Sequence, residues 1–353
     1  MNLSYSQKKY KRSIFIWLIT LTIMVLAIII IGGLTRLTDS GLSMVDWRPI
    51  LGTIPPFSNE DWMEVFNLYK LSPEYLYVNK NMQLNEFKYI FLWEWFHRFF
   101  ARMIGIVFLL PFVYFAIKKY FNFLLYVRFL IIFLLGIFQA FVGWWMVKSG
   151  LNDDPYVSAY LLTFHLFNAL IIFSLLLWTS MEYYYSAKVN FFSNHNTLTF
   201  LIFVAIFITL LTIITGGFMA GTHAGQSFNT YPLMNEKIIP VDYYLSDFGL
   251  LNIFENTIAI NFNHRWMGTI TFIYTFSLFL YFIFTKSSKI TKFLISLVLL
   301  VLTLQFILGI LTLLSNVYIP FASMHQTNSI ILFSTLLISY HQFKTKKSYE
   351  NLQ

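Results

Sequence analysis

Long apolar stretches recur along the chain and are separated by shorter polar segments. Each stretch is about 20 residues long, which lets a helix rising about 1.5 Å per residue cross a hydrocarbon core of about 30 Å. We therefore expect an all-α integral membrane protein. The pattern predicts eight transmembrane helices, at residues 14–34, 99–117, 129–147, 159–181, 198–218, 266–285, 293–314 and 320–340.

The eight stretches form one set of four that is repeated. IIGGLTRLTDSG after the first resembles ITGGFMAGTHAG after the fifth, and FHRFFARMIG in the second resembles NHRWMGTI in the sixth. QAFVG and FHLFNALIIFSLL likewise match QFILG and MHQTNSIILFSTLL. An even number of spans gives the two copies the same direction in the membrane. We predict two tandem, pseudo-two-fold-related four-helix bundles: residues 1–190 with a large outer loop at 35–96, and residues 191–353 with an outer loop at 219–263.

Composition agrees with a membrane protein and excludes several kinds of site. The chain is 58% hydrophobic and 11% charged, far below the roughly 25% charged residues of soluble domains. It has no cysteine, which excludes disulfides, thiolate ligands and iron–sulfur clusters. The net charge of +8 comes from cations clustered on one side of the predicted spans, so it gives no argument for nucleic-acid binding.

The same cations predict the orientation and the membrane. Because lysine and arginine are enriched in cytoplasmic loops, we expect both termini in the cytoplasm. The first span follows KKYKR, but it is too long for a signal peptide and lacks a cleavage motif, so we expect it to be retained in contact with membrane lipid. No amphipathic transit segment precedes it. We expect a bacterial cytoplasmic membrane.

Four histidines are predicted at one depth, near the outer ends of spans on different helices. The repeat pairs His97 with His165, and His264 with His325. Ionisable groups within spans are costly and usually functional. Facing imidazoles on bundle helices commonly hold heme iron, whereas a metal ion without a porphyrin needs further ligands near the pair. The sequence therefore predicts two heme sites.

The other three histidines have no counterpart in the repeat. His195 and His341 lie on the predicted inner side and His223 in an outer loop, and we interpret them as surface residues. Two repeated pairs, Gln139 with Gly143 and Gln305 with Gly309, are interpreted chiefly as sites of close helix contact.

Several arginines lie near the predicted outer ends of the histidine helices: Arg36, Arg98, Arg102 and Arg265. Their fork-like donors could pair with heme propionates. The alternative is that these long side chains simply reach toward the polar interface. Both interpretations stay open at this point.

Glu94 breaks the repeat. It lies three residues before His97 and would share its helix face if the helix begins early, whereas Asn261 occupies the matching position in the second half. A first-turn glutamate can also serve only to stabilise the helix dipole. A carboxylate beside one of two otherwise equivalent sites favours divided roles, with one site for chemistry and the other for electrons.

These residues resemble the heme A synthase family over essentially the whole chain. The resemblance rests on GGLTRLTDSGLSMVDWRPILGTIPP, EWFHR, FHLFNA, HRWMG and MHQTN. It implies oxidation of the C8 methyl of heme O to the formyl of heme A through the alcohol heme I, with water as the oxygen source. It assigns Glu94, His97 and His165 to the substrate and a heme b to His264 and His325. Implied partners are heme O synthase and an unidentified electron acceptor.

Two other functions use the same pattern. A diheme b-type cytochrome taking electrons from quinol needs the four histidines but gives no role to Glu94. A transporter suits the repeat but not the histidines.

Some bacterial members of the family carry a cysteine pair in the first outer loop, and this chain departs from them because it has no cysteine.

Overall fold

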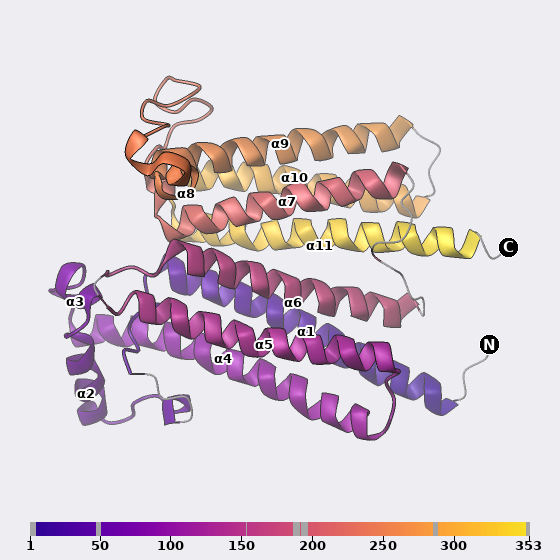
Figure 1. The fold of residues 1–353 in the computed structure, drawn as a ribbon, viewed down its shortest axis with the longest axis horizontal. Helices are drawn as coiled ribbons and strands as arrows, with labels where there is room; N and C mark the ends of the chain where they lie inside the picture. Colours follow the sequence, from indigo (N-terminus) through magenta and orange to yellow (C-terminus); the bar gives the residue numbers. More distant parts are fainter. Residues whose placement is uncertain are drawn as a thin grey trace. The chain divides into compact units, whose positions relative to one another are not determined.

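The computed structural model describes residues 5–46, 51–152, 154–185, 191, 197–284 and 289–350. Within these ranges the regular structure is helical, apart from an isolated bridge between Met234 and Lys237. The long helices there (Figure 1) are α1 (Tyr5–Leu37), α4 (Leu84–Ile117), α5 (Phe123–Ser149), α6 (Ala159–Tyr185), α7 (Thr197–Gly221), α9 (Thr257–Phe284), α10 (Lys289–Leu314) and α11 (Ile319–Glu350). The short ones are η1 (Leu51–Thr53), α2 (Asn59–Tyr69), α3 (Pro73–Tyr77), η2 (Ala224–Gln226), η3 (Ser246–Leu251) and α8 (Asn252–Glu255).

Among the described residues, 7 of the long helices are long and apolar enough to cross a membrane: α1, α4, α5, α6, α7, α9 and α10. Apolar side chains also face outward, as at Leu110 and Ile117 of α4, which are exposed and suit contact with lipid tails. The chain is therefore a multi-pass membrane protein. α11 is comparably long, but polar residues such as Gln326 and His341 interrupt it, and its membrane crossing stays a prediction.

α4 begins at Leu84, well inside the range 35–96 that the sequence predicted as loop. At its start the Glu86 carboxylate accepts a hydrogen bond of 2.7 Å from the backbone N–H of Gln83, which fixes the first turn. Helix α9 likewise begins at Thr257, before the predicted residue 266. Both histidine helices thus extend beyond their apolar stretches.

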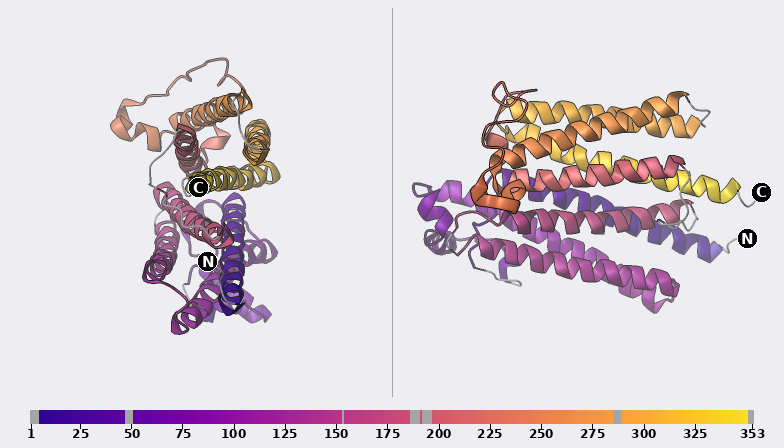
Figure 2. Two further views of the ribbon diagram at one scale, coloured as in Figure 1. Left: turned by 90° about the vertical axis from the view of Figure 1, so that its right-hand side faces the viewer. Right: turned by 45° about the horizontal axis from the view of Figure 1, so that its top comes forward.

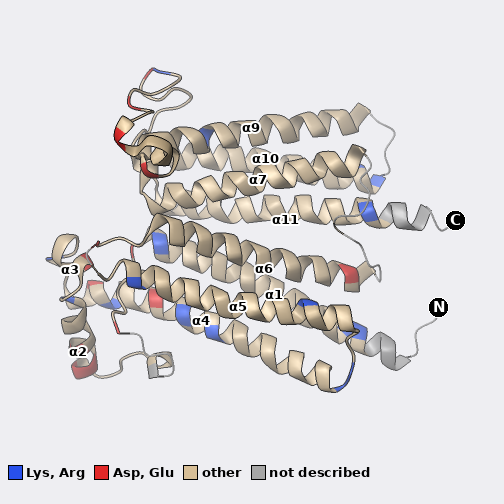
Figure 3. Cartoon of the chain, in the orientation of Figure 1, with Lys and Arg blue, Asp and Glu red and all other residues tan. Residues whose placement is uncertain are grey.

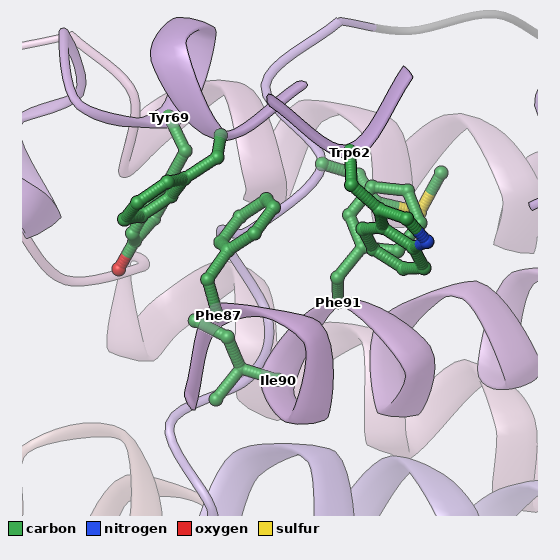
Figure 4. Close-up of a cluster of buried hydrophobic side chains, with 7 residues drawn as sticks. Trp62, Tyr69, Phe87, Ile90 and Phe91 are labelled. Atoms are coloured by element: carbon green, nitrogen blue, oxygen red, sulfur yellow. The ribbon is translucent and has the colours of Figure 1, made fainter. Parts of the chain in front are cut away.

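Aromatic packing explains why α4 extends so far. Figure 4 shows Trp62 and Tyr69 of α2 directed at Phe87, Ile90 and Phe91 of α4. The ring centroids are 5.2 Å apart for Trp62 and Phe91 and 5.0 Å apart for Tyr69 and Phe87. This cluster supplies α4 with an apolar environment outside the predicted span.

Two compact units can be distinguished, Ile23–Ile172 and the combination of Met1–Thr22 with Phe173–Gln353. The divisions fall within α1 and α6. The halves 1–190 and 191–353 rest on the sequence repeat and stay a prediction.

The unit that contains residues 173–353 includes a four-helix bundle. α9 and α11 each contact both α7 and α10, which closes a ring of four (Figure 2, left). A hydrogen bond of 2.7 Å between the hydroxyls of Thr212 and Thr271 ties α7 to α9. Helices η3 and α8 lie at the Thr257 end of α9, whereas Lys289 and Lys344 lie at the opposite end of the bundle (Figure 3).

In the unit Ile23–Ile172, stacked aromatic rings join α4 to α5. The centroids of Phe108 and Phe133 are 6.0 Å apart with nearly parallel planes. α2 and α3 lie at the Leu84 end of α4, whereas the basic residues Lys118 and Lys119 lie at its other end (Figure 3). Lys118 and Lys119 and the loop helices therefore lie at opposite ends of α4.

Candidate functional site

Each of the four predicted ligand histidines packs against a glycine of a neighbouring helix. A Cβ atom added to the glycine would lie 3.3 Å from His97 Nε2 at Gly32, 2.9 Å from His165 Cε1 at Gly143, 3.1 Å from His264 Cε1 at Gly216 and 2.9 Å from His325 Cε1 at Gly309. At Gly143 and Gly309 an added side chain would force a shift, and at Gly32 and Gly216 the contact would be tight. The contacts join α1 to α4 and α5 to α6, and then α7 to α9 and α10 to α11. Every contact in the first half thus has its counterpart at the position that the sequence repeat gives.

His97 differs from the others only in which ring edge meets the glycine. Its Nε2 and Cδ2 atoms face Gly32, at 3.3 and 3.8 Å from the added Cβ, whereas Cε1 and Nδ1 of His264 face Gly216, at 3.1 and 3.7 Å. A half-turn of the His97 ring exchanges these atom pairs without moving the ring plane. The two contacts then become equivalent. His97 also lies close enough to His165 for the two rings to interact electrostatically.

His264 and His325 have the separation expected of two ligands to one metal. Their ring centroids are 6.3 Å apart and the planes are perpendicular, at 87°. A metal–imidazole bond is roughly 2 Å long and a ring nitrogen lies roughly 1 Å from its ring centre, so imidazoles on opposite sides of one metal ion have centroids roughly 6 Å apart. Two imidazoles are also what a porphyrin-bound iron needs from the protein. The pair fits a heme.

Polar neighbours orient both rings of this pair. His264 Nδ1 lies 2.9 Å from the hydroxyl of Thr215, which can accept its N–H and so leave Nε2 for a metal. The Gln305 amide nitrogen lies 3.2 Å from Nδ1 and 3.4 Å from Nε2 of His325, so it contacts this ring without reserving one nitrogen. In the first half, by contrast, the amide of Gln139 donates to the backbone oxygen of His165, and His165 Nδ1 is buried with no hydrogen-bond partner among the described residues.

A buried amide supports each glutamine. Asn168 donates to Gln139 at 2.6 Å and to the Leu135 carbonyl at 3.2 Å. Its repeat counterpart Asn328 donates to Gln305 at 3.0 Å and to the Val301 carbonyl at 2.9 Å. These bonds join α5 to α6 and α10 to α11. The glutamines and glycines of the repeated motifs therefore do lie at helix contacts, where they meet the histidine helices.

Glu94 is buried, with 2% of its surface exposed. Its carboxylate accepts hydrogen bonds from the Ser43 hydroxyl at 2.6 Å and from the backbone N–H of Met44 at 2.8 Å, both in the segment that follows α1. It also forms an ion pair with Arg98, one turn further along α4. The carboxylate is therefore fixed by three donors, one turn from His97.

Asn261 performs the same tethering in the second half without a charge. It is fully buried, and its amide donates to the backbone carbonyl of Ala224, in the segment that follows α7, at 2.7 Å. A neutral side chain thus suffices to tie this helix to the preceding segment. The charge of Glu94 is not required for that structural task.

The arginines divide into three environments. Arg98 pairs with Glu94 and donates to the Met44 carbonyl, and Arg36 pairs with Asp39 at 2.6 Å. Arg265 donates through Nη2 to the carbonyls of the segment 230–233. Among the described residues, Nη1 of Arg265 and Nη1 of Arg102 are buried without a hydrogen-bond partner. Those two donors are available to an anionic group.

The interpretation of His341 as a surface residue is wrong. Its exposed fraction is 0%. The Trp178 ring meets it edge-on with the centroids 4.7 Å apart, and Tyr185 stacks on it at 5.8 Å. These rings come from α6 and cover a side chain that the sequence analysis placed on the predicted inner surface. His195 lies outside the described residues.

Comparison with known proteins agrees with these features. Residues 15–337 match the COX15-CtaA family, described as cytochrome oxidase assembly protein. The chain belongs to this family. A heme A synthase of Nitrosospira multiformis is 38% identical over 341 residues, covering 95% of this chain and 94% of the relative. Heme A synthases of a Wolbachia from Brugia malayi and of Flavobacterium johnsoniae are 38% and 36% identical, over 93% and 95% of this chain and 96% and 99% of theirs.

Some residues of the site escaped the sequence analysis. Ser43 and Thr215 position Glu94 and His264. Thr215 aligns with Ile31 in the repeat, so comparing the halves gave it no weight. Its place directly before the repeated glycine pair was the available signal. For Ser43 there was none, because it meets Glu94 only through the fold.

Proposed function

We propose that the protein is a heme A synthase that oxidises the C8 methyl group of heme O to the formyl group of heme A. The observation that carries the proposal is an asymmetry within a repeat. Both halves hold paired histidines against glycines, but only the first half places a buried carboxylate, Glu94, one turn from a ligand histidine. The names of the curated relatives support the same activity, which makes the protein an oxidoreductase of heme A biosynthesis.

The two histidine pairs take different hemes. His264 and His325 hold a resident heme b, because their separation suits one iron and Thr215 anchors Nδ1 of His264. His97 and His165 hold the iron of the substrate, heme O. Nδ1 of His165 has no hydrogen-bond partner among the described residues. Such a partner typically strengthens metal binding 10- to 100-fold. A histidine without one therefore suits a substrate that must be released as product.

The reaction, which acts on a CH group, releases protons that the protein must accept. Converting a methyl group and one water molecule to a formyl group, by way of the alcohol heme I, releases four protons and four electrons. Heme b, when bound, supplies a route for electrons toward an acceptor in the membrane. Glu94 accepts protons as water adds to the carbon of the C8 methyl group. Ser43 and the Met44 N–H keep the carboxylate in place.

The unpartnered arginine donors bind the propionates. Arg102 lies on the helix of His97, and Arg265 adjoins His264; both present a buried Nη1. Guanidinium–carboxylate pairs are strong where water is excluded. Arg98 is engaged with Glu94, so its part in propionate binding requires that this ion pair be shared or exchanged.

We place the protein in the bacterial cytoplasmic membrane, with α11 as the eighth span and both termini inside. The support is the position of Lys118, Lys119, Lys289 and Lys344 at the helix ends opposite α2, α3 and α8, which matches the positive-inside rule. The histidines then lie toward the outer face. Heme O synthase, which supplies the substrate, is the expected partner.

Heme analysis tests the proposal. The protein is co-expressed with a heme O synthase, purified, and its hemes are extracted and separated by chromatography. We expect heme A, with heme O or heme I, beside heme b. A diheme b-type cytochrome has no use for Glu94 and would contain heme b alone, and that outcome would refute the synthase.

A further inference from the structure

A second buried carboxylate lies in the outer connection of the first half. Glu74, in the first turn of α3, is 6% exposed. Its carboxylate accepts a hydrogen bond of 2.9 Å from the Tyr69 hydroxyl, which in turn accepts one of 2.9 Å from the amide of Asn79. Tyr69 belongs to the aromatic cluster on α4. Glu74 is therefore held at a defined place in the outer connection beside the start of α4.

This carboxylate is electrostatically linked to Glu94. Glu74 and Tyr69 each interact with the charge of Glu94, and Glu74 also interacts with Arg36 and Asp39 at the end of α1. The segment that starts at Arg36 runs on to Ser43 and Met44, which contact Glu94 directly. One short segment thus borders both carboxylates.

The exposure of the residues around Glu74 increases toward the surface of the outer connection. Ser40, Ser43 and Tyr69 are buried, Asn79 is half-buried, and Lys80 is exposed. The hydrogen-bonded group of Glu74, Tyr69 and Asn79 thus reaches from the interior toward the surface of the outer connection, and Glu74 interacts electrostatically with Glu94. Glu94 is more deeply buried, at 2% exposure.

We propose that Glu74 is a proton-relay residue that takes protons from Glu94 and releases them to the outer water. The inference rests on the proposed function, because oxidation of one methyl group to a formyl group requires four protons to leave a site that Glu94 can serve only one at a time. Each transfer moves a proton from the Glu94 carboxyl to the Glu74 carboxylate and then to water. No electron moves in this step.

The chemistry of Glu74 suits a relay near neutral pH. Burial raises the pKa of Glu74 to about 8, and the nearby charges of Glu94 and Asp39 act in the same direction. The Tyr69 hydrogen bond and Arg36 oppose the rise, because both favour the ionised form. A group with its pKa near the working pH can both accept and release a proton.

The pH dependence follows with a defined sign. Glu74 must be ionised to accept a proton, so the relay is slow below its pKa and fast above it. With a pKa of about 8, roughly one molecule in ten is ionised at pH 7 and nine in ten at pH 9. Where proton release limits the reaction, the rate should rise about tenfold over this range.

The test measures heme I and heme A formation from added heme O in membranes containing the protein, between pH 6.5 and 9.5. Wild type and the control Glu60→Gln, which removes an exposed carboxylate of α2, should show the rise. Glu74→Gln should lose it and be about tenfold slower at pH 9, with heme b content unchanged. A Glu74→Gln protein with the wild-type profile overturns the relay.

A second variant protects the test against misfolding. Tyr69→Phe keeps Glu74 but removes a hydrogen bond that favours its ionised form, so the rise should move to higher pH. An unmoved rise in a Tyr69→Phe protein that retains heme b also overturns the proposal. Glu94→Gln separates the two claims: if it abolishes heme A while Glu74→Gln and Tyr69→Phe behave as wild type, the synthase stands and the relay fails.

Discussion

A single methyl group placed opposite His325 should expel heme b. In Gly309→Ala, the new Cβ would lie 2.9 Å from His325 Cε1 and 3.4 Å from Nδ1. Non-bonded carbon atoms prefer about 3.5–4.0 Å, so the imidazole must withdraw by roughly 0.6–1 Å. Metal–ligand distances in working sites vary by only about 0.2 Å. The ring can no longer meet both the backbone of α10 and the iron.

The size of the effect follows from overpacking. Extra methyl groups in well-packed cores cost about 1–3 kcal/mol, which corresponds to roughly 5- to 150-fold weaker heme retention. Helix propensity does not contribute to the loss, because alanine favours helices more than glycine does. The destabilisation therefore comes from the crowded contact between the new methyl group and His325.

The assay compares two matched variants. Gly309→Ala and Gly143→Ala are purified after co-expression with heme O synthase, and the low-spin heme b spectrum and extracted hemes are quantified per protein. Gly309→Ala should lose heme b. Gly143→Ala, which crowds His165 at the same 2.9 Å, should keep heme b and lose heme O and heme A. Wild-type heme b content and spectrum in Gly309→Ala would refute the reasoning.

Replacing His264 or His325 by alanine should remove most of the low-spin heme b spectrum, because each imidazole supplies one of two axial ligands; full retention in both variants, measured on purified protein, would exclude the assignment. A reporter fused after the C-terminal Gln353 should be active only in the cytoplasm, as the lysines at the end of α11 predict. Activity outside would reverse the proposed orientation.

The repeat in the sequence pairs residues that make equivalent contacts in the structure, while the heme sites themselves stay a prediction. Aligning the halves pairs Gly143 with Gly309 and His165 with His325, and each glycine meets its histidine in the structure. Apolar length predicted the apolar part of each long helix but not the early starts of α4 and α9. These features are local, or follow from comparing one local motif with another.

The surroundings of the sites could not be predicted in this way. The early start of α4 depends on Trp62 and Tyr69 of the separate helix α2. No periodic pattern in the sequence of α4 indicates these contacts. Glu74 lies in a polar connection and is buried only through the tertiary fold. His341 is likewise covered by rings of another helix. Burial of polar groups by distant segments leaves no pattern in the sequence around them.

The central claim is that the first half oxidises heme and the second half holds it, and Glu94→Gln tests this most directly. Glutamine keeps the size and most hydrogen bonds of glutamate but cannot accept a proton at neutral pH, and Asn261 shows that an amide can tether this position. Loss of a positioned base typically costs 10²- to 10⁴-fold in rate. Hemes extracted from the variant co-expressed with heme O synthase should include heme b at the wild-type level and heme O, with heme A nearly absent. Heme A at the wild-type level would contradict the account.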